Sequence, residues 1–219
     1  MSTIITKNAA FRLFLCVFLI FFACKKQKDI PASVFFDKGI SSAKKKNYES
    51  CVYNLGKIDE ISPYSSHAKT AQPVLIYCHY MQKNYEQVHS MIENFESIYP
   101  TSDQLSYLHY ISALSYFRVI KSHRKSMQTV QNLALKIQKV NEIDSYSVYA
   151  ENLNKLLPFI AKIQDENTLY IAQNYAKTND FISAAARYST LQEKTLHEET
   201  EKIVENSMND ILMNLGIKE

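Results

Sequence analysis

The residues best suited to metal chemistry are a cysteine and several histidines in the middle of the chain. Cys78 directly precedes His79, and three further imidazoles lie nearby in sequence: His67, His89 and His109. Thiolates and imidazoles are ligands that zinc prefers. Neighbouring residues on a helix point about 100° apart, however, so Cys78 and His79 do not easily face one ion. The sequence also has no His-Glu-x-x-His or paired Cys-x-x-Cys motif, and we expect no metal site.

The dipeptide Glu96-Ser97 is the second candidate for chemistry. It carries the acid in lytic transglycosylases, but the Gly-Leu-Met-Gln-like segment that those enzymes have downstream is missing here. Glycoside cleavage needs a pair of carboxyl groups, and no motif positions a second one. Glu96 is expected to be a solvated helix residue. The three glycines are too far apart to form a phosphate-binding loop, and we predict no catalytic residues and no enzyme.

A short apolar run precedes Cys24. Residues 13–23 are uncharged, and at about 1.5 Å per residue they cover about half of a bilayer's hydrocarbon core. Lys7 and Arg12 supply a positive start and Ala23 a small residue before a cleavage point, so residues 1–23 are predicted to be a signal peptide. An uncleaved membrane anchor is the alternative.

The end of this run, Phe21-Phe22-Ala23-Cys24, resembles a bacterial lipobox, although Phe21 stands where Leu, Ile or Val is usual. The resemblance implies cleavage before Cys24, S-diacylglycerol on its sulfur and an acyl chain on its amino group. Lys25 in the next position implies delivery to the outer membrane, facing the periplasm. Several acyl chains would hold the protein there permanently, since each buried CH₂ contributes about 0.8 kcal/mol.

Charge and cysteine content narrow the function further. Without Lys7 and Arg12 the chain has 23 of its 25 basic residues against 22 acidic ones, so its charge does not favour nucleic-acid binding. Cys51 and Cys78 remain after Cys16 and Cys24 are assigned to the signal and the lipid. They could pair in an oxidising compartment, but we favour free thiols in helix interfaces.

A repeat of 37 residues predicts helical hairpins. Lys46-Asn47-Tyr48 and Lys83-Asn84-Tyr85 are identical tripeptides, and a proline follows each tyrosine by fifteen residues. This spacing is typical of helix-turn-helix solenoids and resembles the tetratricopeptide repeat. Gly39 stands where that repeat needs a very small residue. Asn179-Asp180-Phe181 repeats the register near the end of the chain.

The predicted fold is all-α, a tetratricopeptide-repeat superhelix of about four hairpins and a closing helix. A lipidated tether at 24–32 precedes the repeat domain at 33–219. The repeats are predicted near 33–65, 69–101, 105–141 and 146–196. The closing helix is predicted at 198–216, with Ile203, Ile211, Leu212 and Leu215 on its apolar face and Gly216 as its stop.

The amino-acid sequence of the repeats resembles that of the BamD family, the tetratricopeptide lipoproteins of the β-barrel assembly machinery. The matching segments, in order, are Pro63-Tyr64-Ser65-Ser66, residues 75–83, Ile92-Glu93-Asn94-Phe95, Tyr99-Pro100-Thr101-Ser102, residues 107–111, 156–161 and 170–175. The resemblance implies a scaffold that has no cofactor, catalyses no reaction, and binds unfolded outer-membrane β-barrel proteins and the insertase BamA.

The family also implies roles for individual residues. Arg187 stands where the family has an arginine at its BamA-docking surface, and Tyr175 lies on the preceding helix. Peptide-binding candidates are the tyrosines of the first repeats: Tyr64, Tyr77, Tyr80, Tyr107 and Tyr110. Accessory lipoproteins are further partners, although the long loop that the family carries in repeat three is reduced here to residues 119–125. The alternative function is a generic periplasmic repeat adaptor of the cell envelope or division machinery.

Overall fold

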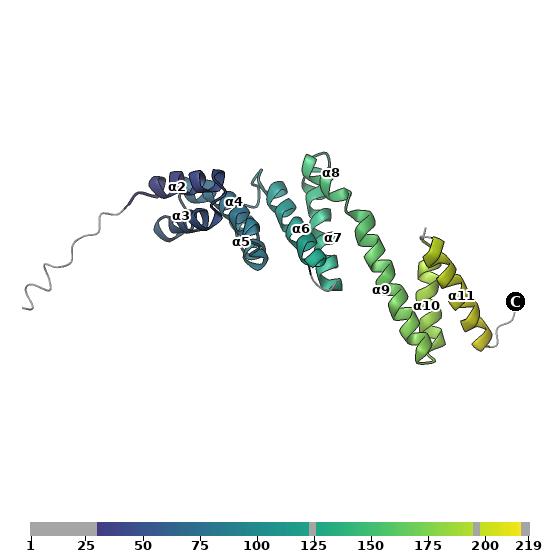
Figure 1. The fold of residues 1–219 in the computed structure, drawn as a ribbon. Helices are drawn as coiled ribbons and strands as arrows, with labels where there is room; N and C mark the ends of the chain where they lie inside the picture. Colours follow the sequence, from purple (N-terminus) through teal and green to yellow (C-terminus); the bar gives the residue numbers. More distant parts are fainter. Residues whose placement is uncertain (1–29, 123–125, 195–197, 216–219) are drawn as a thin grey trace, which may run out of the picture. The chain divides into compact units, whose positions relative to one another are not determined.

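The structure, a computed structural model, describes residues 30–122, 126–194 and 198–215. Within these ranges every regular element is an α-helix (Figure 1), which confirms the predicted all-α class. The predicted signal peptide at 1–23, Cys24 and Gly216 lie outside the described residues. In the same ranges no helix combines the length and the apolar character that crossing a membrane requires.

The chain divides into two compact units, residues 1–71 and 72–219. In the first unit, α2 (Ala32–Lys44) packs against α3 (Tyr48–Ile61), and α4 (Ser66–Met81) begins. A Cβ atom added to Gly39 would lie 2.5 Å from Leu55 Cγ. A residue without a side chain is therefore needed there, which confirms that Gly39 allows two helices to approach closely.

One turn geometry joins α2 to α3, α4 to α5 (Tyr85–Ile98), and α9 (Leu157–Lys177) to α10 (Phe181–Gln192). In each turn the residue two positions after the end of the first helix has a positive φ, which is 60° at Lys46, 65° at Lys83 and 61° at Asn179. The N–H of this residue donates to the carbonyl three residues back, and the next N–H donates to the carbonyl five residues back. These two bonds form the Schellman motif, which satisfies carbonyls at a helix C-terminus.

The residue that completes the motif also begins the next helix in two of these turns. Asn47 Oδ1 accepts a hydrogen bond from the Ser50 N–H at 3.1 Å, and Asp180 Oδ1 accepts one from the Ser183 N–H at 3.2 Å. Asn and Asp are favoured N-caps for this reason. All three second helices begin at the aromatic residue of the repeat: Tyr48, Tyr85 and Phe181.

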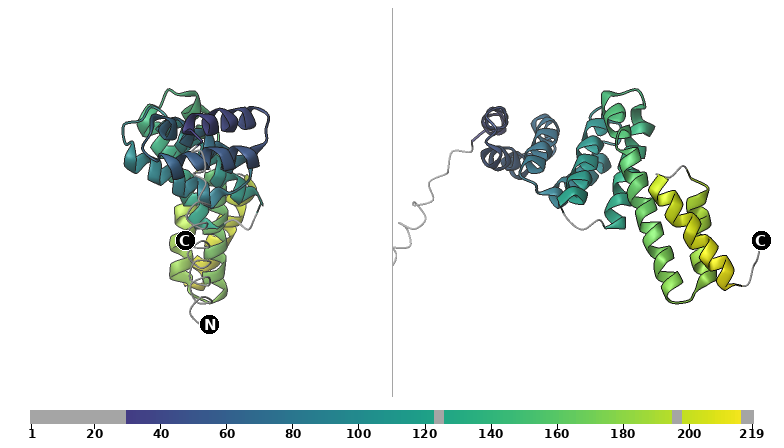
Figure 2. Two further views of the ribbon diagram at one scale, coloured as in Figure 1. Left: turned by 90° about the vertical axis from the view of Figure 1, so that its left-hand side faces the viewer. Right: turned by 45° about the vertical axis from the view of Figure 1, so that its right-hand side comes forward.

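The second unit contains the rest of α4 and the helices that follow it. In addition to α5, α9 and α10 these are α6 (Leu105–Ser122), α7 (Met127–Asp144), α8 (Val148–Asn154) and α11 (Glu198–Asn214). The helix α6 packs against α5 and α7, and α10 packs against α9 and α11. In Figure 2 the helices α9, α10 and α11 lie side by side. A core cluster of buried apolar side chains joins α6, α7, α8 and α9.

The short helix α8 is an addition to the predicted four hairpins and closing helix. Ser147 caps it, because its Oγ accepts a hydrogen bond from the Ala150 N–H at 3.2 Å, and Ala150 and Leu153 are fully buried. Pro158 lies in the first turn of the next helix, α9. Proline has no N–H to continue a helix that started earlier, so the chain breaks into α8 and α9.

The buried face of α11 differs from the predicted one. Val204 and Ile211 are buried and Met208 packs against the same core, whereas Ile203 and Leu215 are 38% and 39% exposed. Residues 204, 208 and 211 follow the spacing of one helix stripe. The prediction for Ile211 is confirmed, and those for Ile203 and Leu215 are wrong.

Both remaining cysteines are oxidised. Cys51 and Cys78 are fully buried, as predicted, but each is disulfide-bonded. The expectation of free thiols is wrong. A buried position alone does not distinguish a thiol from a disulfide, because small apolar character suits both.

Candidate functional site

Four half-buried tyrosines from three helices form what we call the tyrosine cluster: Tyr77 of α4, Tyr107 and Tyr110 of α6, and Tyr149 of α8. The ring centroid of Tyr149 lies 5.7 Å from that of Tyr107 and 5.2 Å from that of Tyr110. Tyr77 is close enough for its charge to affect the pKa of Tyr107. Aromatic pairs at these separations stabilise each other beyond their buried area.

The hydroxyl of Tyr107 is uncharged at neutral pH. Burial raises the pKa of Tyr107 to about 12, and the neighbouring phenols of Tyr77, Tyr149 and Tyr110 contribute to the increase. A protonated phenol both donates and accepts hydrogen bonds. The cluster therefore combines apolar area with hydroxyl groups, a combination that suits an extended peptide with free backbone N–H and C=O groups.

Three of the five tyrosines predicted for peptide binding are brought together in this cluster. Of the other two, Tyr64 lies in the first unit and is 84% exposed. Tyr80 pairs with Tyr85, with ring centroids 6.0 Å apart, and its hydroxyl accepts a hydrogen bond from Arg118. Sequence reasoning missed Tyr149, because its contact with α6 depends on the unpredicted helix α8.

The two residues predicted to bind a partner protein lie on adjacent helices of the second unit. Tyr175 of α9 is 37% exposed, and Arg187 of α10 is exposed. A cavity of about 480 Å³ opens between α9, α10 and α11 and is lined by Gln173, Ala176, Lys177, Phe181, Tyr188, Ser207, Asp210, Ile211 and Asn214. Phe181 and Tyr188 give this hollow aromatic area among polar side chains, and such mixed surfaces are common where proteins bind one another. Neither Tyr175 nor Arg187 lines it.

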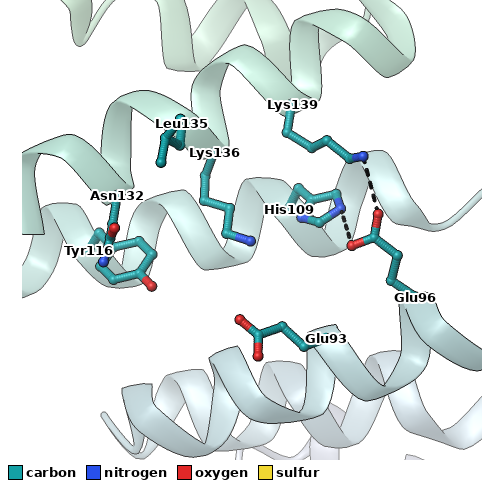
Figure 3. Close-up of a pocket in the computed structure, with 8 residues that line it drawn as sticks. All are labelled: Glu93, Glu96, His109, Tyr116, Asn132, Leu135, Lys136 and Lys139. Carbon is teal, nitrogen blue, oxygen red and sulfur yellow. Dashed lines mark ion pairs between the residues drawn. The ribbon is translucent and has the colours of Figure 1, made fainter.

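A further cavity, of about 450 Å³, lies among α5, α6 and α7 (Figure 3) and is lined by Glu93, Glu96, His109, Tyr116, Asn132, Leu135, Lys136 and Lys139. Figure 3 shows the Glu96 carboxylate next to His109 and Lys139. Its Oε2 lies 3.2 Å from His109 Nε2, and its Oε1 lies 3.3 Å from Lys139 Nζ. The expectation that Glu96 is only a solvated helix residue is wrong, because α5 packs against α6 at this point.

The charges in this cavity are balanced. Burial lowers the pKa of His109 more than the Glu96 carboxylate raises it, so the imidazole is neutral at pH 7. Burial raises the pKa of Glu96, but nearby positive charge outweighs it and leaves that pKa below the ordinary value. Lys139 supplies the permanent cation. Glu96, His109 and Lys139 connect α5, α6 and α7, which is a structural role.

In the part of the chain that the structure describes, no three His, Cys, Asp or Glu side chains come close enough together to hold a metal ion. His79 lies on α4 and His109 on α6, and burial lowers the pKa of each imidazole.

The comparison with known families is decisive. A profile of the YfiO family, described as "Outer membrane lipoprotein", matches residues 28–217, which is most of the chain. The chain belongs to the YfiO family.

This YfiO-family chain is also similar to curated proteins named "Outer membrane protein assembly factor BamD". It is 24% identical to the Pasteurella multocida protein over 179 residues, which are 75% of this chain and 68% of the relative. It is 22% identical to a Xylella fastidiosa protein over 207 residues, or 87% of this chain and 71% of the relative. With the Rickettsia prowazekii protein the identity is 26% over 111 residues, and the match spans 44% of that relative.

Membership of the YfiO family confirms the resemblance drawn from the repeats, and that family is described as outer membrane lipoproteins. The matched range includes all the helices from α2 to α11. Cys24 precedes that range and lies outside the described residues, so its acylation stays a prediction.

Proposed function

We propose that this protein is a non-enzymatic scaffold for the assembly of outer-membrane β-barrel proteins. The observation that carries the proposal is the match to the YfiO family over residues 28–217, on a chain of helical hairpins with exposed aromatic and cationic surfaces. Helical-hairpin repeats bind peptides and proteins along their faces. An acylated Cys24 would keep the scaffold on the outer membrane, facing the periplasm.

Unfolded barrel proteins are the proposed cargo, and the tyrosine cluster is their proposed contact. Unfolded strands present free backbone groups and alternating aromatic or aliphatic side chains. The half-buried rings of Tyr107, Tyr110 and Tyr149 offer apolar area, and their hydroxyls offer hydrogen bonds. Tyr77 completes the cluster.

A BamA-like insertase is the proposed partner of the last three helices. Arg187 is exposed on α10, and only four arginines occur in the whole sequence. A guanidinium is suited to paired hydrogen bonds with a carboxylate of a partner. The cavity between α9, α10 and α11 supplies an adjacent hollow for an apolar side chain of that partner.

Affinity capture of BamA from solubilised membranes tests this assignment. Wild-type protein at native expression should retain BamA, and Arg187→Glu should retain about thirty-fold less, the effect of losing an interface arginine worth about 2 kcal/mol. Lys38→Glu, a charge reversal at an exposed position of α2, is the matched control and should capture as well as wild type. Absence of BamA from the wild-type capture would refute the assignment.

The anchor is tested by Cys24→Ala, which should move the protein from the outer-membrane fraction to the soluble periplasm.

Depletion distinguishes the scaffold from the alternative, a generic periplasmic adaptor. Loss of a barrel-assembly scaffold should lower all outer-membrane barrels together, whereas loss of an adaptor should affect one pathway.

A further inference from the structure

A cavity of about 520 Å³ at one end of α6 carries an unbalanced positive charge. It is lined by Lys83, Tyr85, Arg118, Val119, Lys121 and Ser122. Three of these six residues are cations and none is an acid. Two other cavities of the second unit each include at least one carboxylate: Glu93 and Glu96 in one, and Asp210 in the other.

The cations of this cavity are exposed and positioned by neighbouring groups. Arg118 donates a hydrogen bond to the Tyr80 hydroxyl, which fixes the guanidinium at the cavity. Lys121 Nζ lies 4.9 Å from the centroid of the Phe117 ring. Among the described residues, no carboxylate forms an ion pair with Lys83, Arg118 or Lys121.

Such a set of groups matches a phosphate. A guanidinium binds two phosphate oxygens at once, and ammonium groups add point charges around the same anion. Tyr85 and Val119 border the cations with aromatic and apolar area, a combination found where proteins meet the membrane–water interface. Because the family consists of outer membrane lipoproteins, a surface covered with lipid phosphates is the nearest source of this group.

We propose that Lys83, Arg118 and Lys121 form a binding site for the phosphate of an anionic phospholipid headgroup. The site would give the scaffold a second attachment to the membrane surface, in addition to the acyl chains on Cys24. A headgroup bound here would hold the second unit itself at the membrane surface, whereas acyl chains on Cys24 would attach the chain ahead of the first unit.

Vesicle sedimentation tests the site without the anchor or any partner protein. The chain from residue 24 onward with Cys24→Ala is mixed with vesicles of phosphatidylglycerol and phosphatidylcholine in equal parts, or of phosphatidylcholine alone. It should sediment with the anionic vesicles only. Arg118→Gln with Lys121→Gln should weaken partitioning about thirty-fold, since a basic residue near an anionic surface contributes about 1 kcal/mol.

Two further variants make this test specific. Lys162→Gln with Lys202→Gln removes two exposed lysines elsewhere and should weaken binding less than about three-fold, since those lysines do not line the cavity. Lys83→Asn should weaken it about five-fold and keep the turn, because asparagine tolerates the positive φ of 65° at that position. Circular dichroism of each variant serves as the control for folding.

The outcomes separate the sources of the anion. Equal losses in the cavity variant and the lysine control would overturn the site and leave only diffuse electrostatic attraction. Calorimetric binding of inorganic phosphate that depends on Arg118 and Lys121, without vesicle binding, would overturn the lipid as ligand. Selective loss of vesicle binding in the cavity variants supports the proposal, whatever the result of the BamA capture.

Discussion

Gly39 offers the most direct test of how the first hairpin packs. In Gly39→Ala the new Cβ would lie 2.5 Å from Leu55 Cγ, and Leu55 is fully buried, so α2 and α3 must move apart. Overpacking of this kind costs about 1–3 kcal/mol, and the better helix propensity of alanine returns about 1 kcal/mol. Because the contact is with the fully buried Leu55, the overpacking cost should lie in the upper part of that range, and we expect Gly39→Ala to destabilise the hairpin by about 1–2 kcal/mol.

Gly56→Ala is a matched control within the same unit. Gly56 lies inside α3, and a Cβ added there meets nothing within 4 Å. The substitution should therefore stabilise the hairpin by up to about 1 kcal/mol through helix propensity alone. The same chemical change is thus expected to have opposite signs at two positions of one hairpin.

Hydrogen exchange is the appropriate assay, because the chain has two compact units and unfolding of the whole chain need not be two-state. Amides of α2 and α3 should exchange about 5–30 times faster in Gly39→Ala and about five times slower in Gly56→Ala. Amides of α9 and α10 serve as an internal reference. Equal protection of α2 in Gly39→Ala and wild type would refute the close-packing argument.

Two further perturbations test interactions of the second unit. Burial, with a contribution from Lys136, lowers the pKa of His89 to about 4, below the ordinary value of 6.5. The unfolded chain therefore binds this proton first, and the free energy of unfolding should fall by about 1–2 kcal/mol as the pH decreases from about 6.5 to about 4. His89→Gln should weaken the pH dependence of the free energy of unfolding over this range, as measured by urea denaturation at several pH values. An unchanged pH dependence would contradict the assignment. Asp165 Oδ1 lies 2.6 Å from Lys194 Nζ, which links α9 to the end of α10. Asp165→Asn should cost about 0.5–1 kcal/mol, a difference that shrinks in 1 M NaCl; if salt leaves it unchanged, the effect is not electrostatic.

The hairpin starts could be predicted from the sequence because their signals are local. The positive-φ residue, the cap and the first aromatic residue are consecutive in each turn, as in Lys46-Asn47-Tyr48. Helix capping depends on groups within a few residues of one another. The family resemblance has the same origin, since it rests on the order and spacing of such short segments.

Contacts between distant helices could not be predicted in this way. Glu96, His109 and Lys139 come from three helices and meet only after α5 packs against α6. Tyr149 joins the tyrosine cluster through α8, whose separate existence depends on Ser147 and Pro158. The spacing of apolar residues along one helix does not determine the angle at which the next helix crosses it.

The oxidation of Cys51 and Cys78 shows the same limit in a different form. Periodicity correctly placed both side chains in the interior. Disulfide formation depends on the separation and direction of the Cβ atoms, and neither follows from burial.

The shared caps of the hairpin turns have a consequence for how the chain tolerates changes in length. Asn47 and Asp180 each end one helix and begin the next, so these turns contain no spare residue. One inserted residue would rotate the following helix by about 100° and carry its apolar stripe away from its neighbour. The length of such a turn therefore fixes which face of the second helix meets the first. Insertions and deletions should be tolerated better between hairpins, or where two helices have separate caps.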